Sequence, residues 1–179
     1  MKKTVVLLAL IAPLPTLAQR DTVRSNGRVS AVATTGKLWE QVTNYIAQSA
    51  DDMPEATYAY RPTPEVRTFG QLIGHLAGAQ NSFCASALGE KVPNEDEIEK
   101  THTTKASLAQ AFRESNTYCA RAYAQSDAVA GAPADFFGQP QTRLYILLEN
   151  LAHDNEHYGN IVTYLRLNGI VPPSSRPQR

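Results

Sequence analysis

The chain has 179 residues, with 17 basic and 17 acidic side chains and a formal net charge of zero. No basic stripe of the kind that binds nucleic acid is present, so a nucleic-acid partner is not expected. The two cysteines are not in a C-x-x-C arrangement, which speaks against a zinc knuckle and a c-type haem site.

The first 18 residues have the three parts of a secretory signal peptide. A basic start precedes an apolar run over residues 5–12, and small residues up to Ala18 offer a cleavage site. The run is far shorter than the roughly 20 residues of a membrane-spanning helix. We therefore expect cleavage after Ala18, a secreted or periplasmic protein, and no stable membrane insertion.

The mature chain would carry 15 basic and 17 acidic residues, and its 161 residues suit one domain. We expect a linker over residues 19–28, a helical domain over 29–175 and a short tail over 176–179. The sequence leaves the oligomeric state open, a homodimer included.

Four helices are predicted by apolar residues at helical spacing, and no strand pattern competes with them. They cover about residues 30–49, 68–88, 104–126 and 141–168. The first apolar stripe comprises Val32, Leu38, Trp39, Val42, Tyr45 and Ile46, and the last comprises Leu144, Leu147, Leu148, Leu151, Tyr158, Ile161, Val162 and Leu165. Four helices of this length favour an all-α four-helix bundle.

Caps and connectors support these boundaries. Thr68 and Gln71 form a T-x-x-Q capping box, and Thr104 can cap the third helix. The acidic segment 94–97 is interpreted as a solvated surface turn, and the segment 129–140 as a loop rich in Gly, Ala and Pro. The connections leave open whether neighbouring helices run strictly up and down.

Cys84 and Cys119 are predicted to form a disulfide between the second and third helices. Two cysteines in one small exported domain usually pair, and closing a loop of about 35 residues would add roughly 2–4 kcal/mol. The alternative is two buried thiols.

His153 and His157 lie one helical turn apart, so both imidazoles project from nearly one direction of the last helix. Imidazoles at this spacing can meet on one divalent ion, although a pair of surface histidines that binds nothing is the simpler interpretation of the spacing alone. Both lie at the edge of the buried arc, and His75 occupies a matching place on the second helix. These three residues are the predicted metal ligands.

Two other kinds of metal site are excluded because the chain lacks ligands at the positions that they need. A zinc-protease motif H-E-x-x-H needs Glu after the first His, where this chain has Asp154, and no His, Asp or Glu follows His157. A ferritin-like di-metal site needs Glu-x-x-His on two helices, but the residues three positions before His75 and His153 are the non-acidic Leu72 and Asn150. His102 lies in a polar stretch before the third helix and is expected to be exposed and not a ligand.

The stretches TFGQLIGHLAGAQNSF (68–83) and HDNEHYGNIVTYLRLNGIVPP (153–173) resemble the DinB/YfiT-like superfamily of metalloenzymes, over about residues 28–175. The resemblance implies a four-helix bundle whose three-histidine site would be His75, His153 and His157. The chain departs from the family at Asn160, where Gln is usual, and at Tyr158, where a basic residue is frequent. Some family members resemble transferases that use low-molecular-weight thiols.

Three neutral imidazoles would leave positions of a divalent ion (Zn, Ni, Fe or Mn) open for water or substrate, as in catalytic sites. Such an ion would favour a hydrolase or a thiol-type transferase acting on a small molecule. The alternatives are a bundle that binds metal or ligand without catalysis, and a purely structural bundle. The catalytic acid and base and the substrate cannot be assigned from the sequence.

Three further residues of the last helix are candidates for a role near the histidines, and each also has a structural interpretation. Gly159 would allow a close approach of another group or tight helix packing. Asn150 would orient a ligand or water, or is solvated. Tyr164 would donate a proton, or is a core tyrosine with a satisfied hydroxyl.

Overall fold

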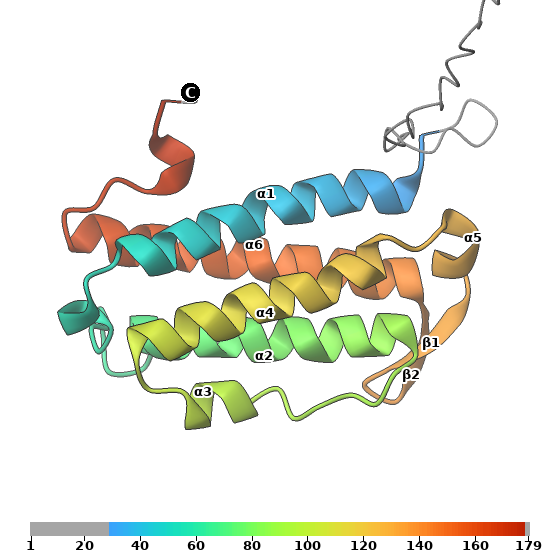
Figure 1. Cartoon of the computed structure of the whole chain (residues 1–179), viewed down its shortest axis with the longest axis horizontal. Helices are drawn as coiled ribbons and strands as arrows, with labels where there is room; N and C mark the ends of the chain where they lie inside the picture. Colours follow the sequence, from blue (N-terminus) through green and yellow to red (C-terminus); the bar gives the residue numbers. More distant parts are fainter. Residues whose placement is uncertain (1–28, 178–179) are drawn as a thin grey trace, which may run out of the picture.

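The computed structural model describes residues 29–177, so the predicted signal peptide and the linker 19–28 lie outside the described residues. Within the described part, four long helices pack side by side (Figure 1). They are α1 (Ala31–Asp52), α2 (Phe69–Leu88), α4 (Lys105–Tyr123) and α6 (Arg143–Leu167). The predicted all-α four-helix bundle is confirmed.

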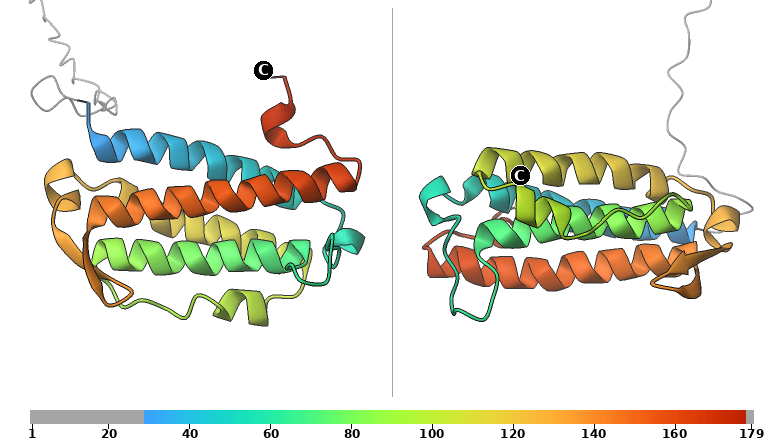
Figure 2. Two further views of the ribbon diagram at one scale, coloured as in Figure 1. Left: turned by 180° about the vertical axis from the view of Figure 1, so that it is seen from behind. Right: turned by 90° about the horizontal axis from the view of Figure 1, so that it is seen from below.

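The four long helices form a bundle with mixed directions. Both α1 and α2 pack against α4 and α6, so α1 lies diagonally across from α2. Figures 1 and 2 show α1 and α6 running one way and α2 and α4 the other. The segment between α2 and α4 therefore runs back along the length of the bundle, and α2 and α6 lie antiparallel to each other.

The predicted caps of the second and third helices are present. Thr68 accepts a hydrogen bond from the Gln71 N–H in a capping box, and Thr104 does the same with Ser107. Three ends differ from the prediction by two or three residues, one of them the start of the fourth helix, which begins at Arg143 and not at residue 141. The first helix continues to Asp52, and the third ends at Tyr123, after which the short α5 (Asp127–Ala130) begins.

A β-hairpin replaces part of the predicted loop 129–140, so the expectation of no strands was wrong. Strands β1 (Pro133–Phe136) and β2 (Gln139–Thr142) pair antiparallel, with Phe136 opposite Gln139. Their length explains the miss, because four residues are too few to show a clear alternation. The hairpin leads directly into α6.

The acidic segment 94–97 is more than a solvated turn. It leads into α3 (Glu97–Thr101), which lies along α2. Gly74 and Gly78 of α2 make this contact possible, because a Cβ at Gly74 would come within 2.8 Å of the Glu99 Cα and one at Gly78 would overlap the Glu95 carbonyl oxygen. Glycines four residues apart on one face of α2 thus allow the backbone of the returning segment to pack directly on the helix.

The core lies between the four long helices and contains Ile46, Phe69, Ile73, Leu76, Phe112, Ile146 and Ile161, all fully buried. Leu38 and Leu148 were wrongly assigned to the inner stripes, since they are 53% and 46% exposed. Cys84 and Cys119 form the expected disulfide between α2 and α4, with their Cα atoms 5.3 Å apart. No helix among residues 29–177 is long and apolar enough to cross a membrane.

Candidate metal centre

His75, His153 and His157 come together where the middle of α2 faces the middle of α6. The ring centroids of His153 and His157 are 4.4 Å apart, and the His75 ring lies 5.1 Å and 5.0 Å from them. One nitrogen of each ring lies within 4.8 Å of the others. Among the described residues, this is the one group of three His, Cys, Asp or Glu side chains that could hold a metal ion.

The spacing of the nitrogen atoms fits a shared ion. The Nε2 atoms of His75 and His153 are 3.1 Å apart. Two nitrogens that each bind one ion at about 2.1 Å would be separated by roughly 3.0–3.4 Å. Without an ion, one Nε2 must donate a proton to the other, whereas a cation lets both atoms offer a lone pair. The residues present therefore fit a divalent ion.

Burial keeps these histidines neutral, as ligation requires. Burial is the main cause that lowers the pKa of His75 to about 4 and that of His153 to about 3. The nearby positive charge of Arg67 lowers both further. The pKa of His157 is also lowered by burial, against the opposing effect of Glu156. At neutral pH all three imidazoles have a free lone pair.

Asn160 contacts the outermost of the three histidines. Its side-chain amide lies 3.3 Å from Nδ1 of His157. The contacting atom is Nδ2, which can only donate, so Nδ1 of His157 accepts in this arrangement. Ligation through Nε2 would need the amide turned so that its oxygen accepts the Nδ1 proton. With its amide turned in this way, Asn160 would hold His157 in the ligating tautomer; the related family pattern has Gln at this position. Nδ1 of His75 and of His153 have no hydrogen-bond partner within residues 29–177.

A cavity of about 650 Å³ adjoins His157 on one side. Its wall includes Arg67, Glu99, Asn160 and Tyr164. Arg67 donates to the Glu99 carboxylate at 3.0 Å, and the Tyr164 hydroxyl donates to the Arg67 carbonyl oxygen at 2.6 Å. Tyr164 is thus a buried tyrosine with a satisfied hydroxyl, which supports the structural interpretation and fixes the segment that carries Arg67.

Sequence reasoning missed Arg67, Glu99 and Asp96 as neighbours of the centre. Asp96 is close enough to His75 for its charge to raise the pKa of that histidine. Asp96 and Glu99 depend on the approach of α3 to α2, whereas Arg67 lies on the segment before α2 that Tyr164 holds. The spacing of Gly70, Gly74 and Gly78 was the available signal, because small residues four apart on one helical face indicate that another segment packs there.

The other candidate residues of α6 are not part of the group of three histidines. Asn150 is fully buried, and its amide donates to the Tyr123 hydroxyl at 3.1 Å, so it is not solvated. A Cβ at Gly159 would meet no atom within 4 Å, so neither close approach nor helix packing explains this glycine in the described structure. Tyr158 stacks on Tyr45 and donates its hydroxyl proton to Ser174.

Asp154 follows the first α6 histidine but lies in the core. It is fully buried, and neither carboxyl oxygen has a hydrogen-bond partner among the described side chains and backbone. Burial therefore raises its pKa well above the usual range, with only slight compensation from the indole of Trp39, which donates to Gln80 at 2.8 Å. Asp154 takes no part in the group of three histidines.

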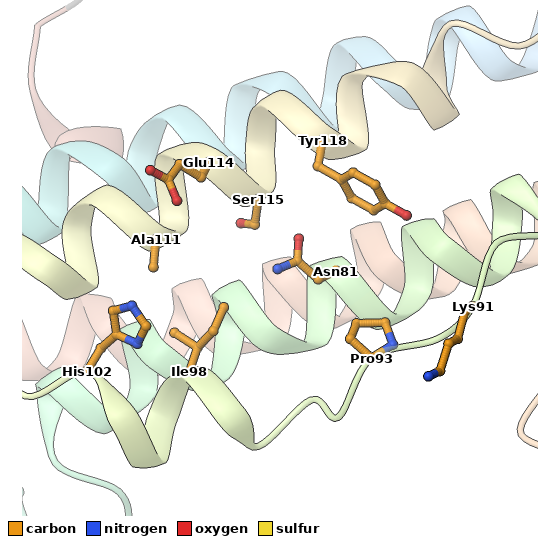
Figure 3. A pocket seen from close by; sticks show the side chains of 9 residues that line it. All are labelled: Asn81, Lys91, Pro93, Ile98, His102, Ala111, Glu114, Ser115 and Tyr118. Atoms are coloured by element: carbon orange, nitrogen blue, oxygen red, sulfur yellow. The ribbon is translucent and has the colours of Figure 1, made fainter.

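His102 does not join the other histidines. It lines a separate cavity of about 480 Å³ between α2, α4 and α3. Figure 3 shows its ring at one end of this cavity, beside Ile98 and Ala111. His102 was expected to be exposed, but it is half-buried, because it lies against Ile98 and Ala111 in the wall of this cavity.

Comparisons with known proteins agree with the fold. A family model described as the DinB superfamily matches residues 38–161. The crystal structure of a DinB-like protein from Bacillus cereus ATCC 10987 is similar, with a TM-score of 0.68 and 21% identity over 78% of this chain and 93% of that one. A mutant of mycothiol-dependent maleylpyruvate isomerase has a TM-score of 0.58 and 14% identity over 75% of this chain and 65% of that one. No curated protein matches the sequence significantly.

Proposed function

The chain belongs to the DinB superfamily, and on this premise we propose that it is a metal-dependent enzyme whose ion is held by His75, His153 and His157. The observation that carries the proposal is the convergence of three neutral imidazoles beside a cavity of about 650 Å³. A cavity of this volume suits a small-molecule substrate. Three protein ligands leave coordination positions free, as in catalytic sites.

When bound, the ion supplies Lewis acidity, which polarises a carbonyl-type group and favours the deprotonated form of a water or thiol nucleophile. His75 and His153 would offer Nε2 and His157 one ring nitrogen to the ion, and Asn160, whose amide lies against Nδ1 of His157, would set the tautomer of that ring. Arg67 stays beside the histidines because Tyr164 and Glu99 hold it, and its charge disfavours their protonation. The reaction is hydrolysis when water is the nucleophile and group transfer when a thiol is.

The metal site is tested by elemental analysis of the full chain purified without a histidine tag. We expect about one equivalent of a divalent metal such as Zn, Ni, Fe or Mn in the wild type and its loss in His75→Ala. His102→Ala is the matched control, because His102 lines the other cavity, and it should keep the metal. Stoichiometric metal in His75→Ala would contradict the site.

The catalytic role is tested by assaying loaded and metal-free protein with esters, amides and adducts of low-molecular-weight thiols. Turnover of an ester or amide that needs the metal supports hydrolysis, and turnover that needs both metal and added thiol supports transfer. Full metal occupancy without turnover of any of these would favour a bundle that binds metal without catalysis.

We also propose that the protein acts outside the cytoplasm. The signal-peptide pattern before Gln19 supports export, and the Cys84–Cys119 disulfide suits an oxidising compartment. Terminal sequencing of protein recovered from the periplasm or the medium should give a chain that begins at Gln19. Recovery only from the cytoplasm, starting at Met1, would contradict export.

A further inference from the structure

Phe137, at the tip of the β-hairpin, has a backbone conformation that is unfavourable for phenylalanine. Phe137 and Gly138 form a two-residue turn between the paired Phe136 and Gln139, and their φ angles are +51° and +77°. A turn with two positive φ angles favours Asn or Gly at its first position. Phenylalanine is disfavoured there because its Cβ approaches the backbone closely in the left-handed region.

Burial of the Phe137 side chain contributes little stability at this position. The residue is 70% exposed, although it has one of the largest apolar side chains. Burial therefore does not offset the backbone strain. A residue that is strained and also exposed suggests a role outside the stability of the fold.

Hydrogen bonds hold the hairpin that carries Phe137 against the neighbouring helices. The Gly138 N–H donates to the Asp135 carboxylate at 3.2 Å, and the Ser86 hydroxyl of α2 donates to the Asp135 carbonyl oxygen. The Arg143 N–H donates to the Ala132 carbonyl oxygen at 3.1 Å, where the hairpin meets α6. The hairpin is thus attached to both helices that carry the histidines.

An aromatic row of Phe83, Phe136 and Phe137 leads from the tip to the metal centre. Centroid distances are 4.6 Å between Phe137 and Phe136, 5.4 Å between Phe136 and Phe83, and 6.3 Å between Phe137 and Phe83. Phe83 then lies 5.5 Å from the His153 ring. The row approaches the centre through His153, whereas the cavity that contains Arg67 adjoins His157.

We propose that Phe137 is a specificity-determining residue that forms, with Phe83 and Phe136, an apolar subsite for an aryl or alkyl group of the substrate. The polar group of the same substrate reaches the three histidines. The inference rests on the proposed function, because it takes the histidines as the place where the reacting group binds. Continuity of the aromatic row with His153 supports a substrate subsite at the tip.

The test uses cobalt-loaded protein and two hydroxamates, propanohydroxamate and 3-phenylpropanohydroxamate, as probes of an open metal position. Binding is followed by the visible spectrum of the cobalt ion. We expect the phenyl probe to bind about tenfold more tightly in the wild type, because its ring is buried against the aromatic row. In Phe137→Asn this preference should fall close to one, while the affinity for propanohydroxamate stays unchanged.

Phe137→Tyr is the matched control, because it keeps the ring, and it should keep the preference. Asn suits the turn, so Phe137→Asn should also raise the Tm, by roughly 2–4 °C. An unchanged preference in Phe137→Asn, or a lowered Tm, would overturn the inference while leaving the metal centre intact. Failure of both hydroxamates to alter the cobalt spectrum would instead contradict the proposed function, and the inference would fall with it.

Discussion

The Nε2 atoms of His75 and His153 face each other at 3.1 Å, although the two residues are 78 positions apart in the chain. This contact places two lone pairs within reach of one ion between α2 and α6. Because both imidazoles are buried and neutral, we expect the stability of the metal-free protein to depend on pH and the metal affinity to depend on the neighbouring side chains.

The stability of the metal-free protein should decrease as the pH falls from about 6.5 to about 4. His75 and His153 have folded-state pKa values of about 4 and about 3, against 6.5 for an ordinary histidine. The unfolded chain therefore binds protons in this range before the folded chain does, and stability is lost on acidification. Each histidine contributes at most about 1.4 kcal/mol per pH unit, and less near pH 6.5 and where water screens the ring.

Urea unfolding of metal-free protein at pH 7, 6, 5 and 4 measures this slope. The double variant His75→Gln/His153→Gln should show a shallower decline, because only its other groups titrate. Parallel curves for wild type and variant would contradict the lowered pKa values.

Asn160→Leu should weaken metal binding by about tenfold or more, because His157 would lose the partner that selects its tautomer. Competition with a chelator of known affinity measures the change. Asn155→Leu is the matched control on the same helix, since Asn155 donates only to the Leu151 carbonyl oxygen. Equal affinities of the two variants would show that Asn160 does not orient the ligand.

Alanine substitutions at Gly78 and Gly159 should act in opposite directions. A Cβ at Gly78 would overlap the Glu95 carbonyl oxygen, so Gly78→Ala should cost about 1–3 kcal/mol and displace the segment leading into α3. At Gly159 a Cβ meets open space, and Gly159→Ala should add about 0.5–1 kcal/mol through better helix propensity. Denaturant unfolding compares both with the wild type. Destabilisation by Gly159→Ala would point to a contact at this face of α6.

Removal of the disulfide should lower the free energy of unfolding by roughly 2–4 kcal/mol, because a loop of about 35 residues would no longer be closed in the unfolded chain. The double variant Cys84→Ala/Cys119→Ala and the wild type treated with reductant should agree in Tm. A Tm in the reduced wild type that equals that of the oxidised protein would argue against a stabilising role.

Local signals in the sequence identified most of the helical framework. Thr68 with Gln71 and Thr104 mark helix starts through hydrogen bonds between residues only three apart. The errors occurred where local periodicity and tertiary packing disagree. Leu38 and Leu148 have helical spacing, yet the neighbouring helices do not cover them.

By itself, the sequence determined the four long helices, the family resemblance and the residues that are candidate ligands, because caps, periodicity and motif spacing are local properties of the chain. Tertiary structure alone decided that the chain returns along the bundle after α2, that α3 packs on Gly74 and Gly78, and that Arg67 lies beside the histidines. It also decided that Asp154 enters the core and that Phe137 has a strained backbone at the tip of the hairpin, from which Phe136 and Phe83 lead to His153. These features arise from contacts between residues far apart in the chain, whose geometry depends on how whole helices pack.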